Sequence, residues 1–339
     1  MKKYNKNGQQ STWLCSIITI GIMIVIGLAG CASSGPSDDF IFWDTALLSS
    51  VTRVTNDGIF KFNPKISPDG TKLLYIEEID TGSIHNRNIV LLRNPTIANK
   101  TTLVSGAAVY HPGWSDNSTN YYYVVLEDDT SKLIRSSATG VGKTYVTRSP
   151  IGKDDRWPSG RGSAIVCSTV QGGKNQIVTL KENGTEITFL GEGFGPSWHP
   201  TEAKIVFVNY VSATDSLKAI YEMDLESGQV TEVYRDPNRY NCDQPSYSAD
   251  GRYILFQKGA EVVTTGSSRD KTEIKTSKEK KWQIFIMNAD GTSGLSALTG
   301  GRVDTYSPSM DADGWLYFIA DFGRDKTEIY RARVNLDMD

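Results

Sequence analysis

The stretch PSYSADGRYILFQ, residues 245–257, reads as a short strand, a turn at Asp250-Gly251, and a second strand rich in β-branched and aromatic residues. A single hairpin of this kind cannot bury its apolar face, so it needs neighbouring hairpins. The same pattern recurs at PKISPDGTKLLYI (64–76), PGWSDNSTNYYYV (112–124), RWPSGRGSAIVCS (156–168), PSWHPTEAKIVFV (196–208) and PSMDADGWLYFI (308–319). The chain is therefore built from repeats.

The six hairpins return at a regular period. Spacings of 48, 44, 40, 49 and 63 residues separate the ends of the turns, at Gly70, Ser118, Gly162, Glu202, Gly251 and Gly314. A second strand-turn-strand element recurs within the period, most clearly at 283–301, and helical periodicity is absent. This period is typical of four-stranded propeller blades. We predict an all-β protein, a six-bladed β-propeller of four-stranded antiparallel blades.

The N-terminal part of the repeat region is expected to close the ring. The sixth repeat supplies three strands, the third at 328–334, and VTRVTN at 51–56 resembles the outer strand of a blade. Pairing these segments would remove two exposed sheet edges. We predict that this N-terminal strand completes the last blade.

Two segments carry a family resemblance. ISPDGTKLLYI (66–76) and QIFIMNADGTSGLSALT (283–299) resemble the WD40-like repeat of the TolB propeller, with its Ser-Pro-Asp-Gly turn and its strand followed by Asn-Ala-Asp-Gly. The resemblance covers about residues 51–335 and implies a TolB-like propeller, a scaffold that presents its channel end to a protein or peptide. Similar repeats occur in carbohydrate-active propellers, so an oligosaccharide lyase or a glycan-binding protein is the alternative.

The first thirty residues look like a targeting segment. Three lysines precede an apolar run from about residue 13 to 28, and Leu28-Ala29-Gly30-Cys31 resembles a bacterial lipobox. We predict a signal peptide at 1–30, acylation of Cys31, a tether at 31–50 and the propeller at 51–339. Because Ala32 follows the cysteine, this resemblance implies the periplasmic face of the outer membrane. The alternative is a transmembrane anchor, since the run is only slightly shorter than the ~20 residues that span a bilayer.

Composition and motifs narrow the function. A net charge of −3 gives no reason to expect nucleic acid, and we expect a monomer whose partner is an envelope protein or peptide. Gly-x-Ser-x-Gly and HExxH motifs are absent, and the three histidines lie at 85, 111 and 199. We therefore predict no catalytic residue, no metal and no cofactor. Cys167 and Cys242 are expected to be single buried thiols.

Two regions remain as candidates for binding. The polar insertion 259–281 in the fifth blade is predicted to be a solvated loop or an extended β-ribbon, with partner binding as a further hypothesis. The residues just before each inner strand should gather at the channel mouth and form an acidic and aromatic rim. The alternative is that these aspartates cap turns and the tyrosines pack between blades. The predicted rim consists, beside Phe194, of Tyr110, His111, Asp154, Asp155, Asp243, Gln244, Asp304 and Tyr306.

Overall fold

The computed structural model describes residues 41–43, 47–80, 82–95, 99–267, 274–291, 294–301, 303–323 and 327–335. They belong to one compact unit, residues 38–339, and all of their regular elements are β-strands. Across these ranges, no helix has the length and apolarity to cross a membrane. The signal peptide and Cys31 lie outside the described residues, so both stay predictions.

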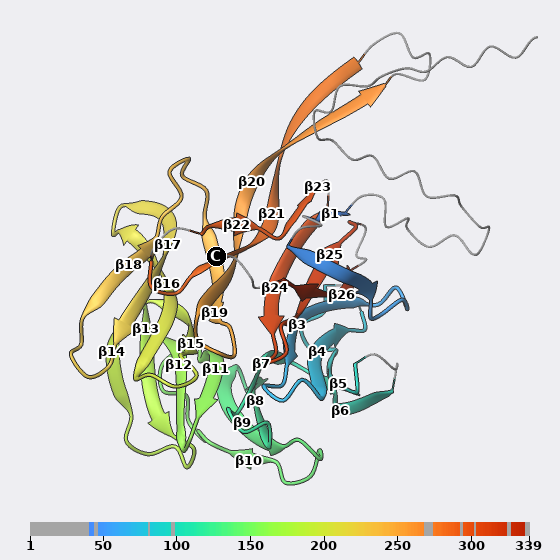
Figure 1. Ribbon diagram of the computed structural model, residues 1–339. Helices are drawn as coiled ribbons and strands as arrows, with labels where there is room; N and C mark the ends of the chain where they lie inside the picture. Colours follow the sequence, from blue (N-terminus) through green and yellow to red (C-terminus); the bar gives the residue numbers. More distant parts are fainter. Residues whose placement is uncertain are drawn as a thin grey trace, which may run out of the picture. The chain divides into compact units, whose positions relative to one another are not determined.

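The strands form six antiparallel four-stranded blades in a propeller ring, which confirms the predicted fold class (Figure 1). The first three blades follow the chain from inner to outer strand. Blade 1 contains β3 (Phe60–Ile66), β4 (Lys72–Glu78), β5 (Arg87–Arg93) and β6 (Lys100–Ala107). Blade 2 contains β7 (Val109–Trp114), β8 (Asn120–Glu127), β9 (Thr130–Ser137) and β10 (Thr144–Tyr145). Blade 3 contains β11 (Arg156–Arg161), β12 (Ala164–Gln171), β13 (Lys174–Lys181) and β14 (Thr188–Glu192).

Blades 4 and 5 have the same arrangement, whereas the outer strand of blade 6 comes from the N-terminal part of the repeat region. Blade 4 contains β15 (Phe194–Trp198), β16 (Lys204–Ser212), β17 (Asp215–Asp224) and β18 (Val230–Tyr234). Blade 5 contains β19 (Cys242–Tyr247), β20 (Tyr253–Ser267), β21 (Ile274–Asn288) and β22 (Ser296–Ala297). Blade 6 contains β24 (Asp304–Met310), β25 (Trp315–Asp321), β26 (Thr327–Val334) and β2 (Leu48–Arg53), and a small pair joins β1 (Ile41–Trp43) to β23 (Thr299–Gly301).

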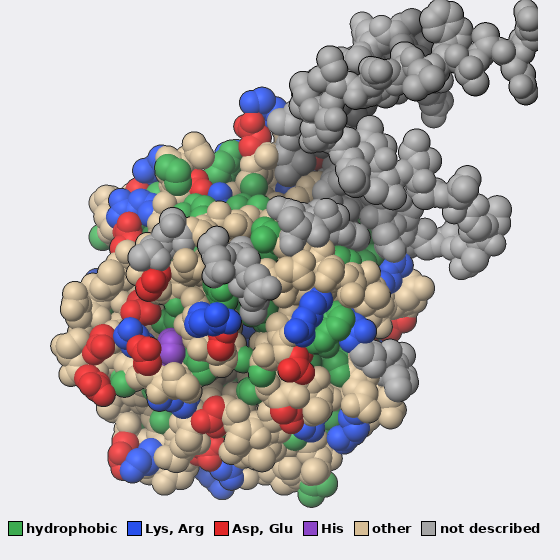
Figure 2. Space-filling model, viewed as in Figure 1, with side chains coloured by type: hydrophobic (Ala, Val, Ile, Leu, Met, Phe, Trp, Pro, Cys, Tyr) green, Lys and Arg blue, Asp and Glu red, His purple; other side chains and the backbone are tan. Residues whose placement is uncertain are grey.

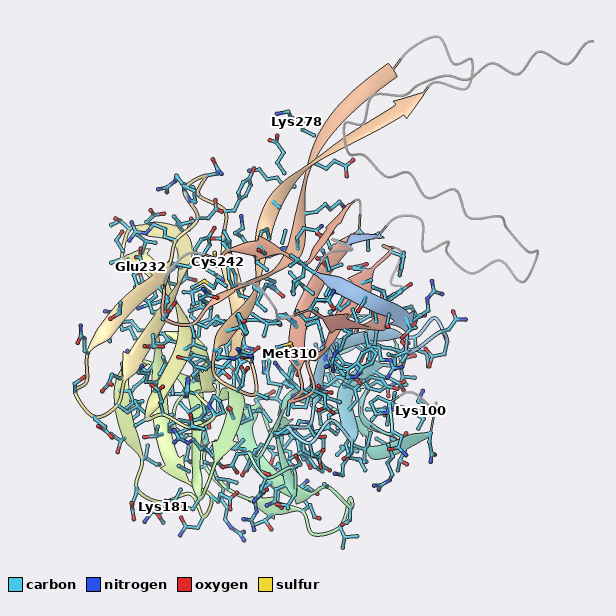
Figure 3. The ribbon with its side chains drawn as sticks, in the orientation of Figure 1. Lys100, Lys181, Glu232, Cys242, Lys278 and Met310 are labelled. Atoms are coloured by element: carbon cyan, nitrogen blue, oxygen red, sulfur yellow. The ribbon has the colours of Figure 1, made fainter. Side chains whose placement is uncertain are left out.

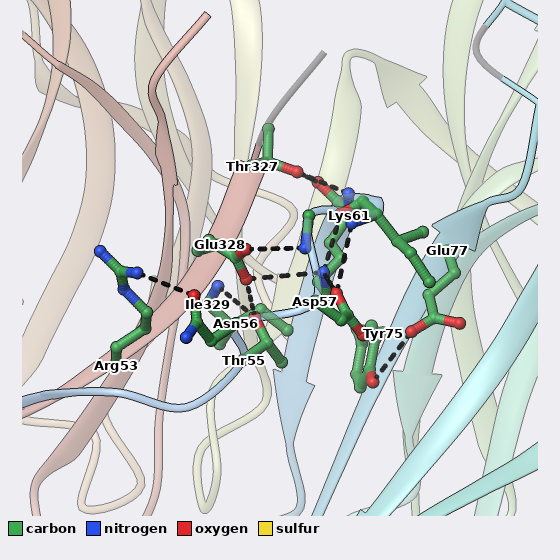
Figure 4. Close-up of polar contacts among 12 residues, drawn as sticks. Arg53, Thr55, Asn56, Asp57, Lys61, Tyr75, Glu77, Thr327, Glu328 and Ile329 are labelled. Carbon is green, nitrogen blue, oxygen red and sulfur yellow. Dashed lines mark hydrogen bonds and ion pairs between the residues drawn. The ribbon is translucent and has the colours of Figure 1, made fainter. Parts of the chain in front are cut away.

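The ring is closed by β2, as predicted, although this strand begins at Leu48 rather than at residue 51. It pairs antiparallel with β26 from Leu48 opposite Val334 to Arg53 opposite Tyr330. Polar contacts seal the same junction (Figure 4): Thr55 Oγ1 donates to Glu328 Oε2 at 2.6 Å, and the fully buried Lys61 ammonium lies 3.5 Å from the same oxygen. The two ends of the repeat region are thus joined by a ladder and by an ion pair.

The hydrophobic core lies between neighbouring blades. One cluster packs Leu73 and Tyr75 of blade 1 against Tyr317 and Ile319 of blade 6, and comparable clusters fill each of the other boundaries between blades. In each blade, both faces of the second strand from the channel are therefore covered. In blade 1 this strand is β4, which is buried at six consecutive residues. This explains why these strands read as continuous apolar runs rather than as alternating patterns.

Every inner strand contains a bulge at an X-Pro dipeptide. The ladder register shifts at this point in all six strands. The residue before each proline has a positive φ between 46° and 61°, and these six residues, the bulge ring, are Asn63, His111, Trp157, Gly195, Gln244 and Ser307. Proline cannot donate to a ladder, and a bulge accommodates it.

The bulges change where the inner strands begin. Most of the predicted rim residues lie within the inner strands rather than before them: Tyr110 and His111 in β7, Phe194 in β15, Asp243 and Gln244 in β19, and Asp304 and Tyr306 in β24. Asp154 and Asp155 precede β11, as predicted. The sequence does not predict a strand ahead of the proline. The missing N–H and the extra residue of the bulge interrupt the alternation of inward and outward side chains at that point.

The predicted insertion in blade 5 is an extended β-ribbon. β20 and β21 have 15 residues each and pair from Tyr253 opposite Asn288 to Ser267 opposite Ile274 (Figure 1). The inner strand β19 pairs with β20 only as far as Lys258, so the ribbon continues beyond the blade. Its tip, residues 268–273, lies outside the described residues.

Candidate functional site

A cavity of about 360 Å³, the central channel, lies in the centre of the ring, and all six inner strands contribute to its wall. It extends from the bulge ring toward the turns that follow the inner strands, and every member of the bulge ring except Ser307 lines it. Met310, another lining residue, lies near the centre of the view in Figure 3, whereas Lys100, Lys181 and Glu232 lie toward its periphery. The repeats thus converge on one concave surface.

The residue after each bulge proline also lines the channel, and five of these six residues are small. They form the post-proline ring, which consists of Lys65, Gly113, Ser159, Ser197, Ser246 and Ser309. At Gly113 a side chain is excluded, because a Cβ would lie 2.0 Å from the carbonyl oxygen of Pro158. Lys65 is therefore the one long side chain in a ring of small ones.

Lys65 carries a charge without a counter-ion. Its ammonium makes no hydrogen bond or ion pair with any residue that the structure describes, and burial lowers its pKa to about 8. By contrast Lys61, in the same strand, is fully buried but contacts the carboxylates of Asp57 and Glu328. An unpaired ammonium in a confined space is unfavourable unless a ligand compensates it.

His111 adds an unsatisfied polar group to the same wall. Its ring lies 4.5 Å from that of Trp157, and its Nδ1 has no hydrogen-bond partner among the described residues. Burial, together with the positive charges of Arg156, Lys65 and Arg87, lowers the pKa of His111 to about 3. The imidazole is therefore neutral at physiological pH. Ser246 likewise has a buried hydroxyl with no partner in the described part of the chain.

The other charged side chains of the wall are engaged in the fold. Arg161 donates from its guanidinium to the carbonyl oxygens of Thr201, at 2.6 Å, and of Glu202. Asp116 accepts the backbone N–H of Gly162 at 2.9 Å. Among the charged side chains of this wall, Lys65 is thus the one without a hydrogen-bond or ion-pair partner in the described part of the chain.

The predicted rim does not assemble into one site. His111 and Gln244 line the central channel, whereas Tyr110, Asp154 and Asp155 line a second cavity of about 420 Å³ between blades 2 and 3. Asp243, Asp304 and Tyr306 line neither cavity. Tyr110 and His111 are consecutive residues of one strand, and successive side chains of a strand point to opposite faces of the sheet, so the two residues line different cavities.

The carboxylates of the predicted rim have partners within the protein. Asp155 is buried and accepts hydrogen bonds from Ile151 N and Gly152 N and, at 2.7 Å, from Thr169 Oγ1. Burial raises the pKa of Asp155 despite these bonds. The remaining pairs are Asp154 with Arg156, Asp243 with Lys218 at 2.9 Å, and Asp304 with Lys281 at 3.5 Å. The rim is therefore charge-balanced, and its role in binding stays a prediction.

Two aromatic members of the rim, Tyr110 and Phe194, lie beside cations. Arg87 lies 4.9 Å from the ring centroid of Tyr110, and Lys218 lies 4.9 Å from that of Phe194. The Tyr306 hydroxyl donates to Asp321 at 3.5 Å, and burial raises the pKa of Tyr306. On the face in Figure 2, acidic and basic side chains are interspersed rather than gathered by sign.

Lys65, Trp157 and Ser246 are channel residues that the sequence did not single out. For Lys65 and Ser246 the signal is present in the repeats, because the letter after each aligned proline is K, G, S, S, S and S. Trp157 lies before its proline, at a position that varies among the repeats. Within the described ranges, no three His, Cys, Asp or Glu residues come together in a group that could hold a metal. Cys167 and Cys242 are buried free thiols.

No family model matches the sequence. An uncharacterized protein of Agrobacterium fabrum is 24% identical over 149 residues, which are 44% of this chain and 44% of that protein. The match thus spans less than half of that relative.

Solved structures that are similar to this chain include a TolB protein, a protein assigned as TolB, and a lyase. A protein assigned as TolB from Agrobacterium tumefaciens has 19% identity and a TM-score of 0.49, over 66% of this chain and 74% of that one. TolB from Acinetobacter baumannii has 14% identity and a TM-score of 0.53, over 79% of this chain and 66% of that one. An oligogalacturonate lyase in complex with manganese has 13% identity and a TM-score of 0.51, over 87% of this chain and 97% of that one.

Identities this low establish the fold alone, since one propeller architecture serves unrelated functions. The blade count, the four-stranded blades and the closure by an N-terminal strand agree with that fold. By its architecture, the chain is a TolB-like six-bladed β-propeller.

Proposed function

We propose that this protein is a non-catalytic binding scaffold of the bacterial cell envelope, which takes a segment of a protein or peptide partner into its central channel. The observation that carries the proposal is the wall of the channel. Six bulged strands surround a cavity with indole rings, prolines and small hydroxyl residues, which suits recognition of an extended segment. At about 360 Å³, the cavity is at the small end of the range for ligand sites, so it takes a few residues of chain rather than a folded domain.

The proposed location rests on the sequence. A lipid on Cys31 would hold the propeller close to the membrane through the short segment that precedes the first strand. Ala32 favours the periplasmic face of the outer membrane, by resemblance to other bacterial lipoproteins. Globomycin treatment, which blocks processing of lipoprotein precursors, should cause the unprocessed precursor to accumulate, and an unchanged band would refute the anchor.

The binding role is tested by filling the channel. Ser197 is a small member of the post-proline ring, so Ser197→Trp should obstruct the cavity, and Val141→Trp changes an exposed site, 73% accessible, away from it. Partners crosslinked to the purified protein in envelope extracts should be retained by Val141→Trp and lost by Ser197→Trp. Both variants must melt near the wild-type temperature. Retention of every partner by Ser197→Trp would refute channel binding.

A second candidate is a carbohydrate ligand. The observation that favours it is the presence of three indoles in the channel wall, those of Trp114, Trp157 and Trp198, because aromatic faces stack on sugar rings. Titration with oligogalacturonate distinguishes the two candidates. Saturable binding that Ser197→Trp abolishes, together with an unsaturated product detected by its ultraviolet absorbance, would indicate a lyase. Binding without product would indicate a glycan-binding protein.

A further inference from the structure

We infer that Lys65 anchors the ligand of the central channel, and that its ammonium pairs with a carboxylate of an acidic peptide segment. This inference rests on the proposed function and specifies the chemistry of the partner. The carboxylate is supplied by an Asp or Glu side chain or by a chain terminus, and a titration with matched peptides separates these sources.

The first argument is the position of Lys65 in the repeats. The five equivalent residues are glycine or serine, so the ring leaves space around the lysine rather than enclosing it with side chains. A lysine placed only for packing would be expected against apolar walls that cover its methylene groups. Here the side chain borders the cavity, so a ligand group has room to reach it.

The second argument is charge. Other confined lysines of the protein have carboxylate partners, among them Lys61 with Glu328, Lys258 with Asp236 at 2.6 Å, and Lys218 with Asp243. Lys65 has none among the described residues, and the nearby His111 is neutral. The wall therefore offers a cation together with a hydrogen-bonding imidazole whose Nδ1 is unsatisfied. Because carboxylates accept charge-assisted hydrogen bonds from ammonium groups, a ligand carboxylate would compensate both the charge and its desolvation.

The third argument selects the kind of anion. Phosphate sites usually combine several cations or a nest of backbone N–H groups. In this wall the guanidinium of Arg161 already donates to two backbone carbonyls, and Lys65 is left as a single point charge. A single ammonium matches a monovalent carboxylate better than a phosphate.

The reporter for binding is the indole N–H of Trp114, which donates to the carbonyl oxygen of Lys65 at 2.8 Å. Its NMR resonance, assigned by Trp114→Phe, would be followed while the purified protein is titrated with three probe peptides. These are acetyl-Gly-Gly-Glu-Gly-Gly-amide, acetyl-Gly-Gly-Gly-Gly-Gly with a free C-terminus, and acetyl-Gly-Gly-Gln-Gly-Gly-amide. We expect saturable shifts with at least one carboxylate peptide and none with the glutamine peptide, and the tighter of the two carboxylate peptides identifies the source.

The matched variants are Lys65→Met and Lys153→Met, which remove the same charge from the channel and from an exposed position at the second cavity. Lys65→Met should lower the affinity for the carboxylate peptide roughly tenfold or more, which corresponds to the loss of one charge-assisted hydrogen bond. Lys153→Met should bind as wild type, and Lys65→Arg should restore much of the affinity because it keeps the charge. Melting temperatures verify that each variant is folded.

Three results would overturn the inference: no carboxylate peptide binds the wild type, Lys65→Met binds it equally well, or a phosphoserine peptide or a digalacturonate binds more tightly. A different result would refute the proposed function, so the two proposals can fail separately. If Lys65→Met retains a partner that Ser197→Trp loses, channel binding stands and the carboxylate anchor is wrong. If Ser197→Trp loses no partner, the binding role itself falls.

Discussion

Trp114 and Lys65 are joined across the boundary between blades 1 and 2 by a hydrogen bond from the indole Nε1 to the backbone carbonyl oxygen, 2.8 Å long. Trp198 makes the equivalent bond to the carbonyl oxygen of Ser159 at 3.0 Å, between blades 3 and 4. In both cases the acceptor belongs to the post-proline ring. The same residues that shape the channel therefore also hold neighbouring inner strands together.

The first prediction concerns this bond. Trp114→Phe should lower the free energy of unfolding by about 1–3 kcal/mol, because it leaves the Lys65 carbonyl without its donor. Trp315→Phe is the control, since the Trp315 ring stacks with Arg331 at 4.5 Å and no indole hydrogen bond accompanies it in the described structure. Urea titrations of both variants measure the difference, and equal losses would show that the indole bond contributes nothing.

The second prediction concerns closure of the ring. Leu48 is 2% exposed and joins the core between blades 5 and 6, so Leu48→Ala should cost about 2–5 kcal/mol. Val230→Ala, on the exposed outer strand of blade 4, should change stability by less than about 0.5 kcal/mol. Deleting residues 40–56 should lower the melting temperature sharply. An unchanged melting temperature for the deletion would contradict closure by β2.

The third prediction separates two neighbouring aspartates. Asp155 is 1% exposed and accepts three hydrogen bonds, so Asp155→Ala leaves buried donors unsatisfied and should cost about 1–3 kcal/mol or more. Asp154→Ala removes a surface ion pair with Arg156 and should cost less than about 1 kcal/mol. Thermal unfolding distinguishes them. Comparable melting temperatures for the two variants would show that Asp155 is not a structural cap.

The fourth prediction concerns acid stability. The pKa of His111 is lowered to about 3, so the unfolded chain takes up a proton near pH 6.5 while the folded protein does not. Stability should therefore fall as the pH decreases below 6.5, by about 2 kcal/mol at pH 5 from this residue. His111→Gln should flatten that slope, whereas His85→Gln, at an exposed site, should not. Denaturant unfolding at pH 7 and pH 5 gives the comparison, and parallel slopes for all three proteins would contradict the buried neutral imidazole.

The fifth prediction concerns Lys65 in the absence of ligand. Its pKa is lowered to about 8, so at pH 7 the folded protein holds a charge that the unfolded chain solvates better. Lys65→Met should raise stability by about 1–3 kcal/mol at pH 7. Between pH 8 and 10 the unfolded chain binds the additional proton, so wild-type stability should rise with pH and approach that of the variant. A destabilised Lys65→Met would show that the lysine serves the fold. In the ligand titration, affinity for a carboxylate should fall above pH 8.

The fold was largely predictable from the sequence because propeller repeats are local. Each hairpin carries its turn residues and its apolar strand within about thirteen residues, and the repeat period sets the number of strands per blade. Even closure could be inferred, because Val51 to Asn56 match an outer strand in pattern. The predicted starts of β2 and of the inner strands were less accurate than the predicted blades. Bulges and edge pairing depend on the neighbouring strand, which a local sequence pattern does not contain.

The candidate site was only partly predictable. His111 and Gln244 were identified and do line the channel, but Asp155 turned out to be a buried cap and Asp243 a partner of Lys218. Whether a carboxylate is free depends on which cation the next strand places beside it, and that pairing is set by tertiary structure.

The sequence by itself thus determined the architecture, because the turns, the apolar strands and their period are encoded within each repeat. Only the tertiary structure decided which side chains meet inside the ring. Lys65 looks like an ordinary strand lysine in the sequence, and it becomes the uncompensated charge of the channel because five small residues from the other blades surround it. That environment is assembled from residues as far apart as 65 and 309, which the ring brings together around one cavity.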